Sequence, residues 1–181
     1  MKKSVLLVLM VLFALQSFSQ TNNESKQEKK EQKIEEQNEA IKNYHQLVST
    51  QKFIVEANSV YGNSGDSYTV SPSVNYFYID SLNATIQLAF DGLVGYNGVG
   101  GITVDGKIEK FDLVELKEGK PVTLSGTIQG KAGAIYTFTM YVNSSGLANV
   151  QLNGNWSNTV NFQGRILNLA QSKVFKGIPI N

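Results

Sequence analysis

The sequence predicts a mainly β domain: an antiparallel meander of about eight or nine strands, closed like an up-and-down, lipocalin-type barrel and preceded by a helical leader. Between residues 121 and 167, apolar residues alternate with Thr, Ser, Asn and Gln, as in strands with one dry and one wet face. Turns that contain glycine and asparagine interrupt the alternation at short intervals. Because such a meander pairs all of its edges by closing, we favour a barrel over an open sandwich.

Residues 1–19 have the layout of a secretory signal peptide. Lys2 and Lys3 precede an unbroken apolar run over residues 5–15, and Ser17 and Ser19 provide the small residues of a cleavage site. A membrane anchor is the alternative, but the run is shorter than the about 20 residues that span a bilayer. We therefore predict an exported, periplasmic or envelope-associated chain with no transmembrane span after cleavage.

The composition excludes several classes of protein. There is no cysteine, which rules out disulfides, thiol catalysis and the lipid-modified cysteine of a lipoprotein. The formal net charge is +1, and no basic patch is interleaved with aromatic residues, so we expect no nucleic-acid partner. An exported domain without disulfides must be stabilised by its core alone.

Residues 20–50 are predicted to form a polar helical leader. Up to Glu39 this segment is almost entirely Glu, Lys, Gln and Asn, and its first half has no apolar face. Apolar residues then recur at helical spacing, at Ile34, Ile41, Tyr44, Leu47 and Val48. This short stripe favours a lid that packs on the β domain, and a spacer or interaction helix is the alternative.

The barrel-like domain is predicted over residues 51–167, and residues 168–181 are predicted to form a C-terminal tail or edge strand. Pro72 argues against a central strand at residues 68–73. The dipeptide Asp105-Gly106 is the strongest short hairpin signal in the chain. It predicts two separate strands between Ile102 and Leu116.

The residue patterns favour no catalytic centre, so the sequence predicts no enzyme, no metal and no cofactor. The glycine-rich segment 92–101 is followed by strand-like residues, whereas a phosphate-binding loop needs a helix there. His45 is the only histidine, so a metal site or a histidine-dependent triad lacks partners. The carboxylates after Thr50, Asp105 among them, lie in predicted turns or among lysines. A carboxylate-dependent hydrolase is therefore the least favoured alternative.

Aromatic residues are the candidate binding groups, with 8 tyrosines, 9 phenylalanines and 1 tryptophan. Four phenylalanines are predicted to lie in the core: Phe77, Phe90, Phe138 and Phe162. Tyrosine and tryptophan beside Asn-rich loops suit a carbohydrate or small apolar ligand. We expect such a site at the barrel mouth, formed by Tyr76, Tyr78, Tyr96 and Trp156.

Three segments together resemble the bacterial exported family called domain of unknown function 4251. They are residues 88–92 with the glycine cluster that follows, the strand at 137–140 with residues 143–148, and the closing segment 162–166. The resemblance covers roughly residues 51–167. It implies a periplasmic or envelope-associated β-rich domain, and it brings no known activity and no site residues.

Two functions fit these observations. The first is a non-enzymatic domain that binds a small apolar or glycan ligand at the barrel mouth. The second is a structural or interaction module of the cell envelope, whose partner is another envelope protein.

Overall fold

The computed structural model describes residues 2–61, 67–89, 101–154 and 159–176. Within these ranges the chain forms one α-helix, nine strands and two short 3-10 helices. The elements are α1 (Lys2–Ser49), β1 (Lys52–Tyr61), β2 (Ser67–Thr69), β3 (Tyr76–Asp80), β4 (Asn83–Leu88), β5 (Ile102–Leu113), β6 (Val122–Gly130), η1 (Lys131–Gly133), β7 (Ile135–Val142), β8 (Leu147–Asn153), β9 (Val160–Asn168) and η2 (Leu169–Gln171).

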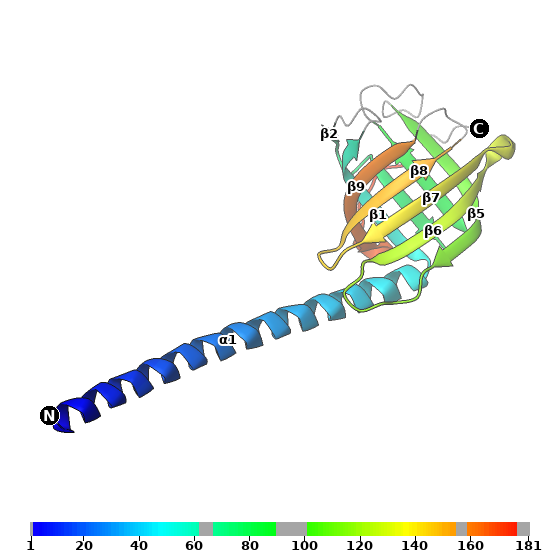
Figure 1. The fold of residues 1–181 in the computed structure, drawn as a ribbon. Helices are drawn as coiled ribbons and strands as arrows, with labels where there is room; N and C mark the ends of the chain where they lie inside the picture. The colour runs from blue at the N-terminus through cyan, green and yellow to red at the C-terminus, as the bar shows by residue number, and fades with distance from the viewer. Residues whose placement is uncertain (1, 62–66, 90–100, 155–158, 177–181) are drawn as a thin grey trace. The chain divides into compact units, whose positions relative to one another are not determined.

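Eight of the strands, β1 and β3 to β9, form a closed antiparallel barrel (Figure 1). The barrel closes where β9 pairs with β1, from Phe53 opposite Asn168 to Tyr61 opposite Asn161. The short strand β2 is additional and pairs with the far end of β1. The predicted fold, a mainly β antiparallel barrel behind a helix, is confirmed.

Alternate side chains of each strand fill the barrel interior. In β3, Phe77 and Ile79 belong to the hydrophobic core, so Tyr76 and Tyr78 face outward. The rings of Phe77 and Phe138 meet edge to face, with centroids 5.0 Å apart. Phe77, Phe138 and Phe162 are all buried in the core, as predicted, whereas Phe90 lies outside the described residues.

Strand β5 corrects one prediction. Asp105-Gly106 is not a hairpin turn but the middle of a single strand of 12 residues. A Cβ atom on Gly106 would lie 2.5 Å from Cγ2 of Ile128 and 2.7 Å from the main-chain oxygen of Gln129. Glycine is therefore needed at this position because β5 and β6 approach closely there, and not because the chain turns.

The last turns of α1 pack against the barrel. The chain divides into two compact units, Met1–Asn38 and Glu39–Asn181. In the second unit, Ile41 and Val48 are buried in the same hydrophobic cluster as the barrel interior, and Tyr44 and Leu47 pack against that cluster. The helical segment 39–49 therefore covers one end of the barrel, as a lid does (Figure 1).

In the first unit, α1 is continuous, and its side chains from Lys26 to Gln37 are exposed. Over the described part of the chain, the helix has no stretch that is both apolar enough and long enough to cross a membrane. Export and cleavage of the first 19 residues remain predictions.

Candidate functional site

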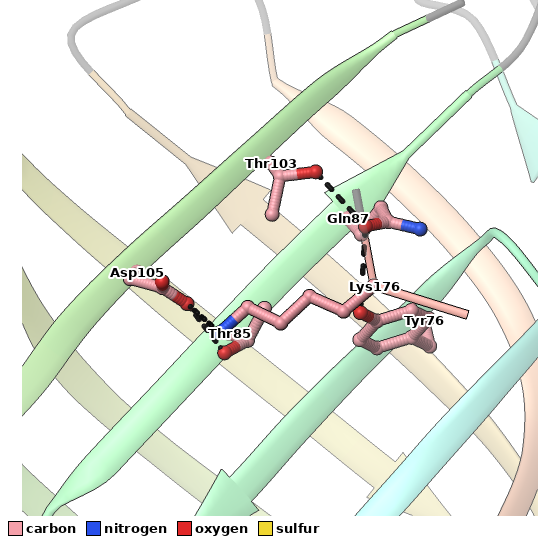
Figure 2. A network of polar contacts seen from close by, with 6 residues as sticks. All are labelled: Tyr76, Thr85, Gln87, Thr103, Asp105 and Lys176. Carbon is pink, nitrogen blue, oxygen red and sulfur yellow. Dashed lines mark hydrogen bonds and ion pairs between the residues drawn. The ribbon is translucent and has the colours of Figure 1, made fainter. Parts of the chain in front are cut away.

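A polar network lies on the outer face of β3, β4 and β5 (Figure 2). The strand register places Tyr76 opposite Gln87, Gln87 opposite Thr103, and Thr85 opposite Asp105. Side chains directly opposite each other in antiparallel strands are neighbours on one face of the sheet. We call these five residues, together with Lys176, the outer-wall network.

Gln87 is the centre of the outer-wall network and is fully buried. Its Oε1 accepts hydrogen bonds from the Thr103 hydroxyl at 2.9 Å and from the Tyr76 hydroxyl at 3.4 Å. Its Nε2 donates to the main-chain oxygens of Val74 at 3.1 Å and Phe175 at 2.7 Å. Burial of an amide costs little free energy when its donors and acceptors are all paired in this way.

The segment Ser172 to Lys176, which we call the C-terminal strap, crosses this outer face. The Ser172 hydroxyl donates to Oε1 of Glu56 at 2.6 Å. The main-chain nitrogen of Phe175 donates to the main-chain oxygen of Ser73 at 2.7 Å, and Nζ of Lys176 lies 2.8 Å from Oδ1 of Asp105. The described part of the predicted tail thus follows the barrel wall without forming a strand.

Burial changes the acidity of two tyrosines in this region. It raises the pKa of Tyr76 to about 12, and the charges of Asp105 and Tyr78 act in the same direction. Burial also raises the pKa of Tyr78, and the neighbouring charge of Asp80 adds to that effect. Both phenols are therefore protonated at neutral pH, and each can donate a hydrogen bond.

Two adjoining cavities are hollowed into the same wall. One has a volume of about 440 Å³ and is lined by Asn83, Asp105, Gly106, Lys107, Glu109, Gln129, Gly130 and Lys131. The other has a volume of about 360 Å³ and is lined by Tyr78, Asp80, Asn83, Ala84, Thr85, Asp105, Gly106 and Lys176. Because they share Asn83, Asp105 and Gly106, we treat them as one depression and call it the outer-wall groove. Its size is in the range of small-ligand sites.

The structure separates the four tyrosine and tryptophan residues predicted to bind a ligand. Tyr76 and Tyr78 lie on the outer wall, and only Tyr78 lines the outer-wall groove. Tyr96 and Trp156 lie outside the described residues. A ligand-binding role for these residues remains a prediction.

Sequence reasoning missed Thr85, Gln87, Thr103 and Lys176. Thr85, Gln87 and Thr103 each lie between apolar residues in the sequence, but alternation cannot tell which part of the outer face another segment will cover. Asp105 was assigned to a turn and lies instead inside a strand, where it accepts a 2.7 Å hydrogen bond from the Thr85 hydroxyl.

The other candidate groups are His45 and the carboxylates. Nε2 of His45 lies 3.2 Å from the main-chain oxygen of Val114, so this histidine takes part in the contact between helix and barrel. Among the residues that the structure describes, no three His, Asp or Glu side chains gather as metal ligands. Asp80 and Asp105 line the same cavity.

Comparisons with known proteins agree with the fold. Residues 35–166 match the family described as "Domain of unknown function (DUF4251)". The crystal structure of a DUF4251 family protein from Bacteroides eggerthii DSM 20697 is 30% identical and superposes with a TM-score of 0.64, covering 78% of this chain and 96% of that one. Among curated proteins, none matches the chain. The predicted resemblance is therefore confirmed: this chain belongs to the DUF4251 family.

Proposed function

We propose that the chain is an exported, non-enzymatic binding domain that holds a small polyhydroxylated ligand, of the glycan class, in the outer-wall groove. The observation that supports this proposal is the make-up of the groove. It brings an aromatic ring (Tyr78), an amide (Asn83) and charged groups (Asp105 and Lys107) to adjoining cavities of about 440 and 360 Å³.

This set of side chains is better suited to binding the hydroxyl groups of a ligand than to binding an apolar ligand. Carboxylate and amide oxygens accept hydrogen bonds from hydroxyls, and lysine ammonium groups donate to them. The ring of Tyr78 offers an apolar surface beside a polar tip. An apolar ligand would instead remove Asp105, Lys107 and Glu109 from water without replacing their hydrogen bonds, which is costly.

The barrel interior is less suitable as a ligand site. Large side chains such as Phe53, Phe77 and Leu88 fill it and are fully buried. Protein interiors packed in this way do not accept a ligand without repacking. We therefore assign the ligand to the outer wall and not to the interior.

Two further features favour an exported binding domain. The first 19 residues have the layout of a signal peptide, which favours export. In the outer-wall groove, Asp105 is bound by Thr85 and Lys176. A carboxylate-dependent hydrolase would need Asp105 to act as a pair with a second carboxylate of the groove, such as Asp80 or Glu109. The contacts that Asp105 already makes leave the hydrolase alternative less well supported.

The first experiment is native mass spectrometry of the protein recovered from the periplasm of the cells that make it. The second is an NMR titration of the ¹⁵N-labelled chain with maltose, cellobiose and chitobiose. We expect saturable shifts at the amides of Asn83, Asp105 and Lys107 with at least one of these sugars. The variant Lys107→Ala should weaken that response, whereas Lys120→Ala, an exposed lysine outside the groove, should leave it unchanged.

Three results would count against the proposal. A ligand-free mass, together with no NMR response to any of the sugars, would favour the alternative function, an envelope interaction module. Shifts confined to residues outside the outer-wall groove would place the ligand elsewhere. Cleavage of a disaccharide during the titration would support the hydrolase instead.

A further inference from the structure

The contacts of the C-terminal strap are of the kind by which a binding site holds an extended peptide. At its centre, both main-chain polar groups of Phe175 are bound: the oxygen by Gln87 and the nitrogen by Ser73, each at 2.7 Å. At its ends, the side chains of Ser172 and Lys176 bind carboxylates. In peptide recognition, main-chain bonds provide affinity for any extended segment, and side-chain contacts select the sequence.

No side chain of the C-terminal strap is fully buried, although Ser172 and Val174 are half-buried. The ring of Phe175 is 61% exposed, and Lys173 and Lys176 are also exposed. Beneath it, Gln87 and Thr103 are fully buried. A segment held by a few polar contacts opens more readily than the strands of the core.

The receiving face is organised by bonds that do not involve the strap. The amide of Gln87 is oriented by the hydroxyls of Tyr76 and Thr103 and by the main-chain oxygen of Val74. Asp105 is likewise oriented by Thr85. These groups would keep their positions if the strap left, so the face is preorganised for a peptide.

We propose that the outer face of β1, β3, β4 and β5 is a peptide-binding site. The chain's own C-terminal strap occupies this site, and the site can exchange the strap for the same segment supplied by another molecule. The recognised pattern is a serine, three further residues and a lysine. The serine meets Glu56, the lysine meets Asp105, and Gln87 binds the main chain between them. The peptide site shares Asp105 and Lys176 with the outer-wall groove, but it does not require the glycan ligand proposed above.

The test uses the full chain with the substitution Phe175→Pro. Proline has no main-chain N–H, so the variant loses the bond to Ser73 and its strap is weakened while the receiving face is unchanged. Phe175→Ala is the matched control, because it removes the exposed ring and keeps the N–H group. Each ¹⁵N-labelled chain is titrated with a synthetic peptide of residues 172–176 and, separately, with the same peptide carrying proline at the position of Phe175.

We expect the Phe175→Pro chain to bind the unmodified peptide saturably, with shifts at the amides of Ser73, Gln87 and Thr103. The wild-type and Phe175→Ala chains should bind it at least tenfold more weakly because their own straps compete. The proline peptide should not bind. Replacing the peptide's lysine at position 176, the one that pairs with Asp105, by alanine should weaken binding about two- to fivefold, as for an exposed ion pair.

Absence of any shift at these amides in a folded Phe175→Pro chain would overturn the proposal. If that variant does not fold, hydrogen exchange in the wild-type chain tests whether the strap is exchangeable. Exchange of the Phe175 amide at least a hundredfold faster than that of Phe138 in the core would support an exchangeable strap. Exchange of both amides at one rate would make the strap a permanent part of the barrel. Neither measurement involves a sugar, so this proposal and the glycan proposal can fail separately.

Discussion

Nε2 of Gln87 donates a 2.7 Å hydrogen bond to the main-chain oxygen of Phe175, a residue that follows it by 88 positions in the chain. This bond joins the middle of the barrel wall to the C-terminal strap. The same side chain also binds Val74, Thr103 and Tyr76. Gln87 thus lies on the outer face of the barrel and is nevertheless fully buried, beneath the C-terminal strap.

The substitution Gln87→Ala should lower the free energy of unfolding by about 2–3 kcal/mol, because it leaves buried polar partners without their hydrogen bonds. The control is Gln151→Ala, an exposed glutamine on β8, for which a change within about 0.5 kcal/mol is expected. Urea denaturation followed by circular dichroism measures both. Equal effects of the two substitutions would contradict a structural role for the network.

The substitution Phe138→Ala should lower the free energy of unfolding by about 3–5 kcal/mol. Phe138 is buried, and its ring meets that of Phe77 edge to face, so its removal leaves a cavity in the barrel. Phe175→Ala is the control, because that ring is largely exposed and its loss should be nearly neutral. Thermal unfolding of both variants checks this, and an unaltered Phe138→Ala midpoint would argue against the packed interior.

The contact between α1 and the β7–β8 turn predicts that two similar glycine substitutions lower the stability by different amounts. Gly119 and Gly146 both have positive φ, 66° and 79°, but a Cβ on Gly119 meets nothing within 4 Å, whereas one on Gly146 would lie 2.4 Å from the hydroxyl of Tyr44. Gly119→Ala should cost about 1 kcal/mol through the backbone alone. Gly146→Ala should cost more, by the free energy needed to displace the ring of Tyr44 from the turn.

The double variant Gly146→Ala with Tyr44→Ala tests the source of that excess. If the extra loss of stability in Gly146→Ala comes from the contact between α1 and the β7–β8 turn, removing the Tyr44 side chain should restore part of the lost stability. The effects of the two substitutions on the free energy of unfolding will then not be additive. Chemical denaturation of the four chains gives the coupling. Strict additivity would show that Tyr44 does not rest on this turn.

The stability of the protein should fall at alkaline pH through Tyr76. Its folded-state pKa of about 12 lies above the ordinary value of 10.0, so the folded state favours the protonated phenol. This contribution is complete below pH 10 and is lost as the pH rises from 10 to 12. Its size is at most about 3 kcal/mol.

The comparison with Tyr76→Phe isolates this residue from the other groups that titrate in the same range. Between pH 10 and 12, urea unfolding should show a smaller loss of stability for Tyr76→Phe than for the wild-type chain. At neutral pH the variant should be only about 0.5–1 kcal/mol less stable, because it loses a single long hydrogen bond to Gln87. Parallel pH profiles of the two chains would contradict the raised pKa.

Most of the barrel could be predicted because alternation is a local property. The pattern in residues 121–167 specified β6 to β9, and short turns left closure as the way to pair the edges. Asp105-Gly106 misled the prediction because the same dipeptide suits a tight turn and a close approach of two strands. The continuous strand β5 and its close approach to Ile128 and Gln129 distinguish these two uses.

The candidate site was less predictable for a related reason. The tyrosine and tryptophan set was selected by residue type, and residue type does not tell the inner face of a barrel from its outer face. Tyr76 and Tyr78 face outward because Phe77 between them belongs to the core. One partner of Gln87, Phe175, and one partner of Asp105, Lys176, come from the end of the chain, and local patterns carry no information about such distant pairing.

The sequence by itself determined the family, the antiparallel barrel and the helical stripe of the lid, because each depends on residue types at fixed local spacing. Only the tertiary structure decided that the strap crosses β3 to β5, that Lys176 pairs with Asp105 and that the groove lies on the outer wall. The physical reason is that these features depend on contacts between residues far apart in the chain. Such contacts are fixed by the register and closure of the barrel, after the local rules have been satisfied.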